Sequence, residues 1–197
     1  METQDSEIED AEFAIDQRKG WPDELRILLK EHPRDTWRSQ RSPLAEFWLD
    51  KHDYFRRQCD ALQQATDDYR AERCTPAQYG AWIAPRVQNF ISHLHGHHQI
   101  EDFHYFPAWR AAESRLARGF DVLESDHRLL HEGIMSMVET VNAFILAFRD
   151  DPNTTTDPQR HAAEQFIKTS ELAFKRLRRH LEDEEDLIIP LMFIQGH

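Results

Sequence analysis

Apolar residues recur at helical spacing along most of the chain, and this pattern predicts helices almost everywhere. Alternating apolar and polar runs bounded by turn dipeptides, which indicate strands, do not occur, and glycine is rare, with 6 in 197 residues. Residues 1–12 carry several acids and little to bury, which predicts a frayed arm. Residues 22–32 have leucines at helical spacing and stop at Pro33, which predicts a short packing helix.

Four longer helices are predicted after this segment. Three of them begin where a capping residue precedes a proline, at Ser42-Pro43, Thr75-Pro76 and Asp157-Pro158. The expected helices cover residues 43–70, 76–106, 120–149 and 158–189. Rods of this length are expected to pack antiparallel, so the prediction is an all-α, up-down-up-down four-helix bundle.

Two smaller features complete the predicted fold. A short helix over residues 108–117 is expected after the second long helix, with Gly119 separating it from the third. Pro85 is expected to bend or break the second long helix. The organisation is then an acidic arm with a short packing helix over residues 1–40, and the bundle over residues 41–197.

Charge and cysteine content exclude several classes of function. The net charge of −12 would repel a phosphate backbone or an anionic membrane surface, so neither nucleic acid nor membrane is an expected partner. No window approaches the roughly 18 consecutive apolar residues of a membrane span, and the first thirty residues have no apolar signal-peptide core. We therefore expect a cytoplasmic protein. Cys59 and Cys74 match no disulfide, zinc or redox motif.

One motif occurs twice and carries the candidate chemistry. His97 is followed four residues later by Glu101, then directly by another acid, and Pro107 lies six residues after Glu101. His180, Glu184, Glu185 and Pro190 repeat these offsets in the fourth long helix. Because residues i and i+4 share one face of a helix, each His and Glu pair points into the same space.

The first and third long helices each carry a histidine near the middle, His52 and His127. Together with the two pairs they give four imidazoles and two carboxylates facing one bundle interior. This mixture suits two iron ions, since imidazole binds iron well and carboxylates favour oxygen-loving ions and can bridge two metals. The absence of cysteine from the set argues against a structural zinc site.

These residues resemble those of the hemerythrin family, also called HHE cation-binding domains, over Pro43–Leu191. The resemblance is carried by His52 and by three stretches in order: HLHGHHQIEDFHYFP, DHRLLHE and HLEDEEDLIIP. It implies a hemerythrin-like bundle holding a non-haem di-iron centre with a bridging oxo or hydroxo group. The implied ligands are His52, His97, Glu101, His127, His180 and Glu184, with the two glutamates as bridges.

Several neighbouring residues are compared with the family pattern. Oxygen-carrying members have a second histidine one turn after the lone one on the third helix, and His131 occupies that place, so it is a further candidate ligand. Their last carboxylate is an aspartate five residues after its histidine, whereas this chain has Glu184 at four and Glu185 at five. The paired cysteines of iron–sulfur repair relatives are missing.

The other histidines and acids near the motifs are not predicted as metal ligands. His93 precedes His97 by one turn, so an inward position stays open for it. His95, His98 and His104 are expected in solvent or in support of the ligands. The acidic run 182–186, apart from Glu184, is expected to be a solvated face.

Three functions follow from these expectations. The favoured one is a binding protein that takes oxygen, nitric oxide or peroxide at an open iron position, for sensing, storage or stress protection, with a redox partner that the sequence does not identify. The alternative is a di-iron enzyme, either an oxidase or peroxidase or an iron–sulfur repair protein. The third is a metal-free helical interaction protein that uses its acidic surface.

Overall fold

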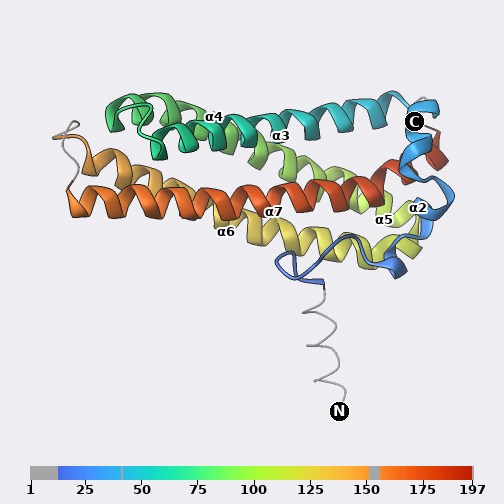
Figure 1. Cartoon of the computed structure of the whole chain (residues 1–197). Coiled ribbons are helices and arrows are strands. Elements are labelled where there is room, and N and C mark those ends of the chain that lie inside the picture. The colour runs from blue at the N-terminus through green and yellow to red at the C-terminus, as the bar shows by residue number, and fades with distance from the viewer. Residues whose placement is uncertain (1–12, 41, 151–155, 197) are drawn as a thin grey trace, which may run out of the picture. The chain divides into compact units, whose positions relative to one another are not determined.

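The computed structural model describes residues 13–40, 42–150 and 156–196, and within these residues every regular element is helical (Figure 1). The predicted frayed arm over residues 1–12 lies outside them. The chain divides into two compact units. The first contains Met1–Asp53, His98–Arg128 and Arg176–His197, and the second contains Tyr54–His97 and Leu129–Lys175.

Four long helices each contribute to both units, and they match the four predicted from the sequence. They are α3 (Pro43–Arg70), α4 (Pro76–Ile100), α6 (Ala117–Ala147) and α7 (Asp157–Gln195). The bounds of α3 are the predicted ones. A capping box starts α4, because the backbone N–H of Gln78 donates to Thr75 Oγ1 and that of Thr75 donates to Gln78 Oε1.

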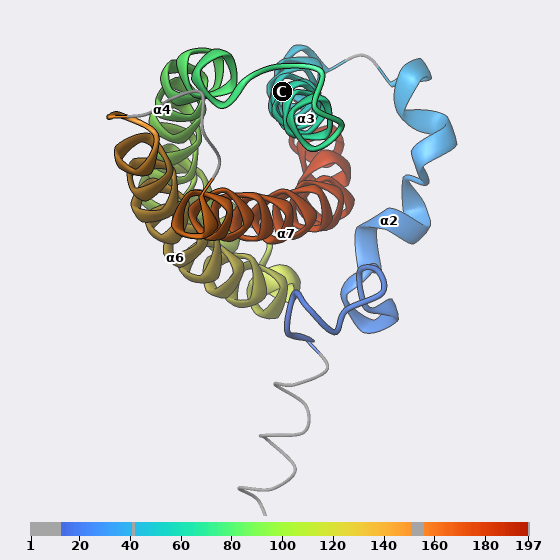
Figure 2. The same ribbon diagram turned by 60° about the vertical axis from the view of Figure 1, so that its left-hand side comes forward.

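The first unit has a large apolar core to which the segment before α3 contributes. This segment contains two short 3₁₀ turns, η1 (Asp23–Leu25) and η2 (Arg34–Ser39), on either side of α2 (Ile27–Glu31), so the predicted helix over residues 22–32 is shorter and broken. Trp21 and Trp37 anchor the segment in the core beside Trp48 and Trp109. Figure 2 shows the segment running from α6 to the start of α3 within this unit.

The second unit is held together by aromatic packing between its own helix segments. Tyr69 and Tyr79 stack with ring centroids 4.6 Å apart, and Phe144 meets Tyr79 edge-on at 5.4 Å. Burial raises the pKa of Tyr79 to about 12, and its hydroxyl forms a hydrogen bond with Thr66 Oγ1 at 2.9 Å. Such pairs add stability beyond that of the buried area alone.

The end of α4 differs from the prediction in a way that shapes the site. Pro85 does not break α4, which continues through it to Ile100. The helix then changes to a π-helical turn, η3 (Glu101–Tyr105), closed by a hydrogen bond from the Phe106 N–H to the Glu101 carbonyl. Pro107 follows in the first turn of α5, where its missing N–H is tolerated. Single π turns of this kind often occur at functional sites.

The short helix after the second long one is also displaced. It forms α5 (Phe106–Ala112), followed by the 3₁₀ turn η4 (Ser114–Leu116), and α6 begins at Ala117. The prediction that Gly119 separates two helices is wrong, because Gly119 lies inside α6. The expected end near Pro190 is also wrong, since α7 passes through this proline to Gln195.

Gly119 has a packing role instead, which can be tested. A Cβ at this position would lie 2.7 Å from Leu187 Cδ1 and 3.2 Å from Trp21 Cζ2, both in the buried core. We expect Gly119→Ala to lower the free energy of unfolding by up to about 2 kcal/mol, because overpacking costs about 1–3 kcal/mol and the better helix propensity returns about 1. Denaturant unfolding measures this change.

Gly133 on the same helix provides the control for this substitution. Its Cβ would lie 3.8 Å from the Ala173 Cβ, an ordinary contact, so Gly133→Ala is expected to be neutral or stabilising. Equal effects of the two substitutions would show that Gly119 is not needed for close packing.

One helical stretch, Ser114–Ala147, is long and apolar enough to cross a membrane by length and composition alone. A core helix of a soluble protein passes the same test, so this is weak evidence for a membrane span. The same stretch carries Asp126 and His127, both buried within the first unit. The cytoplasmic location stays a prediction.

Candidate metal centre

Five of the six predicted ligands lie in the first unit, and all five are buried. His52 comes from α3, Glu101 opens the π turn η3, His127 comes from α6, and His180 and Glu184 lie one turn apart on α7. His52, Glu101, His180 and Glu184 are 0% exposed and His127 is 5% exposed. Burial of ionisable groups to this degree is rare unless they are paired or bind a metal.

The two buried glutamates lie at the centre of this group, and we call them the central carboxylates. Glu184 Oε2 lies 3.5 Å from His52 Nε2 and 3.4 Å from His180 Nε2. Glu101 Oε2 lies 3.5 Å from His127 Nε2. The Nε2 atom of every one of these three imidazoles therefore faces a central carboxylate.

The opposite nitrogen of each ring, Nδ1, faces a second acid, and we call these three acids the outer carboxylates. His52 Nδ1 lies 3.0 Å from Glu185, His127 Nδ1 lies 2.7 Å from Asp102, and His180 Nδ1 lies 3.4 Å from Asp126. Because an ionised carboxylate only accepts, the proton sits on Nδ1 and donates outward. The Nε2 atom of each ring is then directed inward, where it could bind a metal ion, as in the carboxylate–histidine–metal arrangement of metalloproteins.

The electrostatics of the group call for a cation. Burial raises the pKa of Glu101 well above its ordinary value, and the nearby Glu184 carboxylate raises it further. Burial lowers the pKa of His127, which favours the neutral ring that binds metals. Burial also works to lower the pKa of His180, but its bonds to Asp126 and Glu184 outweigh this effect and raise the pKa to about 9.

The distance between two of the rings supports the same conclusion. His127 Nε2 and His180 Nε2 lie only 3.0 Å apart. The raised pKa of His180 supplies a proton that can lie between these two nitrogens in the metal-free protein, and a bound cation would take its place. A donor set of buried imidazoles and carboxylates, which release protons when a cation binds, therefore fits a metal ion.

Within the first unit the potential ligand atoms fall into two groups. His98, His127 and His180 offer ring nitrogens that all lie within 4.8 Å of one another. His52, Glu101 and Glu184 likewise offer ligand atoms within 4.8 Å of one another. Each of these two groups could hold a metal ion.

Comparison with known proteins agrees with this geometry. The family model of the hemerythrin HHE cation binding domain matches residues 44–192. The chain belongs to the hemerythrin HHE family. The predicted fold, an all-α chain with the long helices of a hemerythrin-like bundle, is thereby confirmed. Searches of the curated proteins and of the solved structures found no significant match.

Sequence reasoning did not select His98 of this hemerythrin domain as a ligand. His98 is 6% exposed, and its ring stacks on that of His127 with centroids 4.1 Å apart. The signal was present, because His98 precedes Glu101 by three residues and residues i and i+3 are also neighbours on a helix. The sequence analysis instead paired Glu101 with His97, because that spacing is repeated at His180 and Glu184.

His97, the sixth predicted ligand, belongs to the second unit. There its ring lies 5.0 Å from that of Phe55. It ends the α4 segment of that unit, one turn before Glu101 in the chain.

The remaining histidines near the motifs lie at the surface. His131, the further candidate ligand, is exposed, and its ring lies 5.8 Å from that of His95. His93 forms a hydrogen bond with the Tyr54 hydroxyl at 2.9 Å on an exposed surface. His95 and His104 are exposed, as expected. The structure brings none of these four into the two groups of ligand atoms.

The acidic run on α7 departs most clearly from the sequence prediction. Asp183, Glu185 and Asp186 are 0%, 3% and 8% exposed, so most of the expected solvated face is buried, whereas Glu182 is exposed as expected. Burial raises the pKa of Asp183, against the effect of Arg18 and Arg179, and burial likewise raises the pKa of Asp186, against that of Arg34. Arginines from outside the repeated motif thus compensate these acids.

Proposed function

We propose that this chain is a non-haem di-iron protein that binds a small ligand, namely oxygen, nitric oxide or peroxide, for sensing, storage or stress protection. The proposed protein ligands are His52, His97, Glu101, His127, His180 and Glu184, to which the geometry of the first unit adds His98. When bound, the two irons would supply redox chemistry and an open coordination position. The supporting observation is the inward Nε2 and outward Nδ1 orientation of three buried imidazoles around two buried carboxylates.

The choice of iron rests on the donor set. Imidazole nitrogens combined with two carboxylates suit iron, whereas structural zinc sites usually contain thiolates. Neither cysteine belongs to the two groups of ligand atoms among the described residues. Glu101 and Glu184 are close enough to interact with each other, as two carboxylates that share a pair of ions would be.

Burial of the group supports a small ligand. Trp48 covers one side, where its indole N–H donates to Glu184 Oε1 at 3.0 Å. Phe106 covers the His127 ring, with centroids 5.4 Å apart and an interplanar angle of 18°. An apolar wall of this kind admits a diatomic molecule or peroxide more readily than a larger substrate, and it limits access of water.

Iron loading followed by exposure to gas tests the proposal. We expect the chain, reconstituted anaerobically with ferrous iron, to retain about two irons after removal of excess metal, as the two ligand groups predict. Addition of oxygen or nitric oxide should then change the absorption spectrum in proportion to the protein. Metal analysis and stopped-flow spectroscopy measure these results.

The outcomes separate the candidate functions. Failure to retain iron would favour the metal-free interaction protein. Retention of iron with continuous consumption of peroxide would favour the enzyme, whereas a stable adduct formed once per centre supports the binding protein.

A further inference from the structure

The segment before α3 lies outside the residues matched by the hemerythrin domain, yet it is part of the core of the first unit. We call its described part, residues 13–40, the N-terminal segment. Trp21 and Trp37 are 1% and 8% exposed. Their indole N–H groups donate to the backbone oxygens of Leu25 at 3.3 Å and His32 at 2.8 Å. The segment is therefore built into the unit that carries the central carboxylates.

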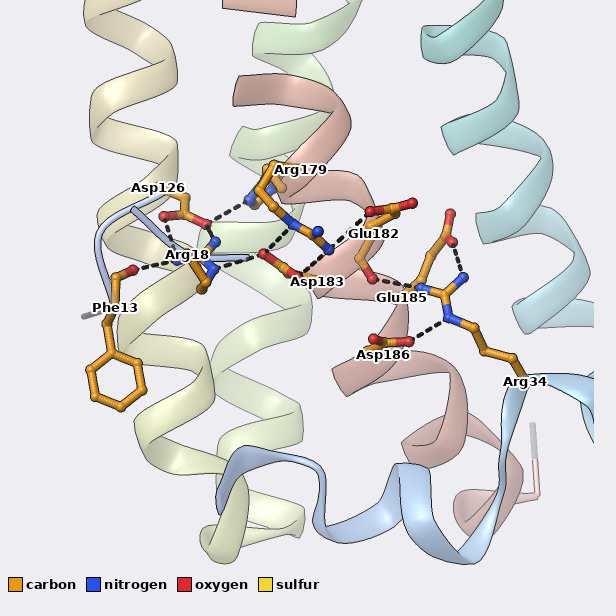
Figure 3. Close-up of polar contacts among 10 residues, drawn as sticks. Phe13, Arg18, Arg34, Asp126, Arg179, Glu182, Asp183, Glu185 and Asp186 are labelled. Atoms are coloured by element: carbon orange, nitrogen blue, oxygen red, sulfur yellow. Dashed lines mark hydrogen bonds and ion pairs between the residues drawn. The ribbon is translucent and has the colours of Figure 1, made fainter. Parts of the chain in front are cut away.

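Arg18 of this segment is inserted between α6 and α7 (Figure 3). Its side chain is 1% exposed, its Nη2 lies 2.5 Å from Asp126 Oδ2, and its Nε donates to Asp183 Oδ2 at 2.7 Å. Its Nη1 donates to the backbone carbonyl of Phe13. Asp126 is the outer carboxylate of His180, so Arg18 fixes the group that accepts from the His180 ring.

Arg34 makes an equivalent contact with the outer carboxylate of His52. Its Nη1 donates to Glu185 Oε2 at 3.5 Å, and its Nε donates to Asp186 Oδ1 at 2.6 Å (Figure 3). A third bond, from Nη2 to the Glu182 carbonyl at 2.9 Å, fixes the guanidinium against the α7 backbone. Glu185 in turn lies 3.0 Å from His52 Nδ1.

Both arginines are themselves held by the segment. The Arg18 guanidinium carbon lies 5.7 Å from the centre of the Trp21 ring, and that of Arg34 lies 5.0 Å from the Trp37 ring. Cation–π contacts of this kind orient a guanidinium and partly compensate for its removal from water. The same three-residue offset, from arginine to tryptophan, thus occurs twice in the segment.

The geometry points to a role for the N-terminal segment in the metal centre: Arg18 and Arg34 are positioning residues that hold the outer carboxylates Asp126 and Glu185, and thereby aim the Nε2 atoms of His180 and His52 at the ions. This inference rests on the proposed function. Outer partners of metal-bound histidines fix the ring and its tautomer, and their loss weakens metal binding. Here arginines outside the matched residues provide a further layer of support.

Iron release from substituted proteins tests this role. We expect Arg18→Gln and Arg34→Gln each to speed release of ferrous iron to a chelator by roughly 10-fold or more, the usual consequence of losing outer support of a ligand. The absorption spectrum of the oxidised, loaded protein should also shift, because the imidazole orientation changes. Circular dichroism of the metal-free proteins confirms that each variant is folded.

Two further variants separate positioning from general stabilisation. Asp16→Asn removes the ion pair between the N-terminal segment and Arg176, in which Arg176 Nε lies 2.9 Å from Asp16 Oδ1, without touching an outer carboxylate. We expect it to leave the release rate and the spectrum unchanged. Asp126→Asn removes the outer carboxylate itself and should release iron at least as fast as Arg18→Gln. The double variant should be no faster than Asp126→Asn, because Arg18 acts on His180 through Asp126.

Each outcome bears on the inference. Wild-type release rates and spectra in both arginine variants would overturn it, as would an equal acceleration by Asp16→Asn. If Arg18→Gln fails to fold, Arg34→Gln decides alone, since that arginine side chain is 45% exposed and its loss leaves less charge buried. A wild-type chain that takes up no iron would refute the proposed function and the inference together, whereas an iron-loaded wild type with unaffected variants would refute only the inference.

Discussion

Replacement of both His180 and Glu184 by alanine is expected to abolish iron retention while leaving the helix content largely unchanged. The pair removes one ligand from each of the two groups, because His180 belongs with His98 and His127, and Glu184 belongs with His52 and Glu101. Neither ion then keeps its full set of protein ligands. Iron should fall from about two per chain to nearly none, as binding energy that depends on a preformed site is lost.

Helix content should survive because α7 does not depend on these two side chains. Its last turns are held by the apolar core of the first unit, in which Leu187, Ile188 and Ile189 are 1%, 0% and 0% exposed. Removal of a buried carboxylate also relieves electrostatic repulsion in the metal-free state. Far-ultraviolet circular dichroism and metal analysis measure the two results on the same samples.

A matched control uses the same residue types on the same helix. His161 and Glu164 are both exposed on α7, so His161→Ala with Glu164→Ala removes one imidazole and one carboxylate away from the two groups. This control should keep wild-type iron content. Normal iron content in the His180 and Glu184 variant would refute the site.

The candidate ligands could be selected from the sequence because the helical period decides which side chains share a face. A histidine and an acid four residues apart share a helix face, and the repetition of this spacing at His97 and His180 led to the prediction of one site. The structure buries His180 and Glu184 side by side on α7. The long helices could also be predicted from the sequence, since their capping residues and prolines are local signals. The predicted bounds of α3 agree with the structure for this reason.

The features that sequence reasoning missed depend on contacts between distant parts of the chain. The acids around Glu184 look like a solvated surface run in the sequence. Their burial depends on ion pairs with Arg18 and Arg34, which lie 165 and 152 residues from their partners, as well as on the local pair between Arg179 and Asp183. The burial of His98 could not be predicted without the geometry of the helix around η3, which begins three residues later. Gly119 looked like a helix break because its packing against Leu187 is invisible in the local pattern.

Glu101→Gln is expected to change metal binding and metal-free stability in opposite directions. Gln has nearly the same shape as Glu but no charge. Loss of an outer partner of a ligand lowers metal affinity by up to about 100-fold, so loss of this ligand charge should lower iron affinity by at least about 100-fold. Without metal the variant should be more stable than the wild type at pH 8. Thermal unfolding with a chelator present measures this gain, where each ~1 kcal/mol raises the midpoint by about 2–4 °C.

The sign of the stability change follows from the direction of the pKa shift. Burial, and then the charge of Glu184, raise the pKa of Glu101 in the folded chain. A carboxyl group whose pKa is raised by folding destabilises the fold increasingly as the pH rises above its ordinary pKa. Glutamine does not titrate, so the variant and the wild type should differ at pH 8 and converge near pH 4.

The exposed Glu182 provides the control, because Glu182→Gln on α7 removes a carboxylate at the surface and should leave the iron affinity unchanged. If Glu101 only stabilised the fold, its substitution would lower the stability of the protein and would leave the iron affinity unchanged. A lower unfolding midpoint for Glu101→Gln at pH 8, with wild-type iron content, would therefore show that Glu101 is a structural residue. The expected pair of opposite changes instead identifies a side chain whose buried charge destabilises the empty site and is compensated by the bound cations.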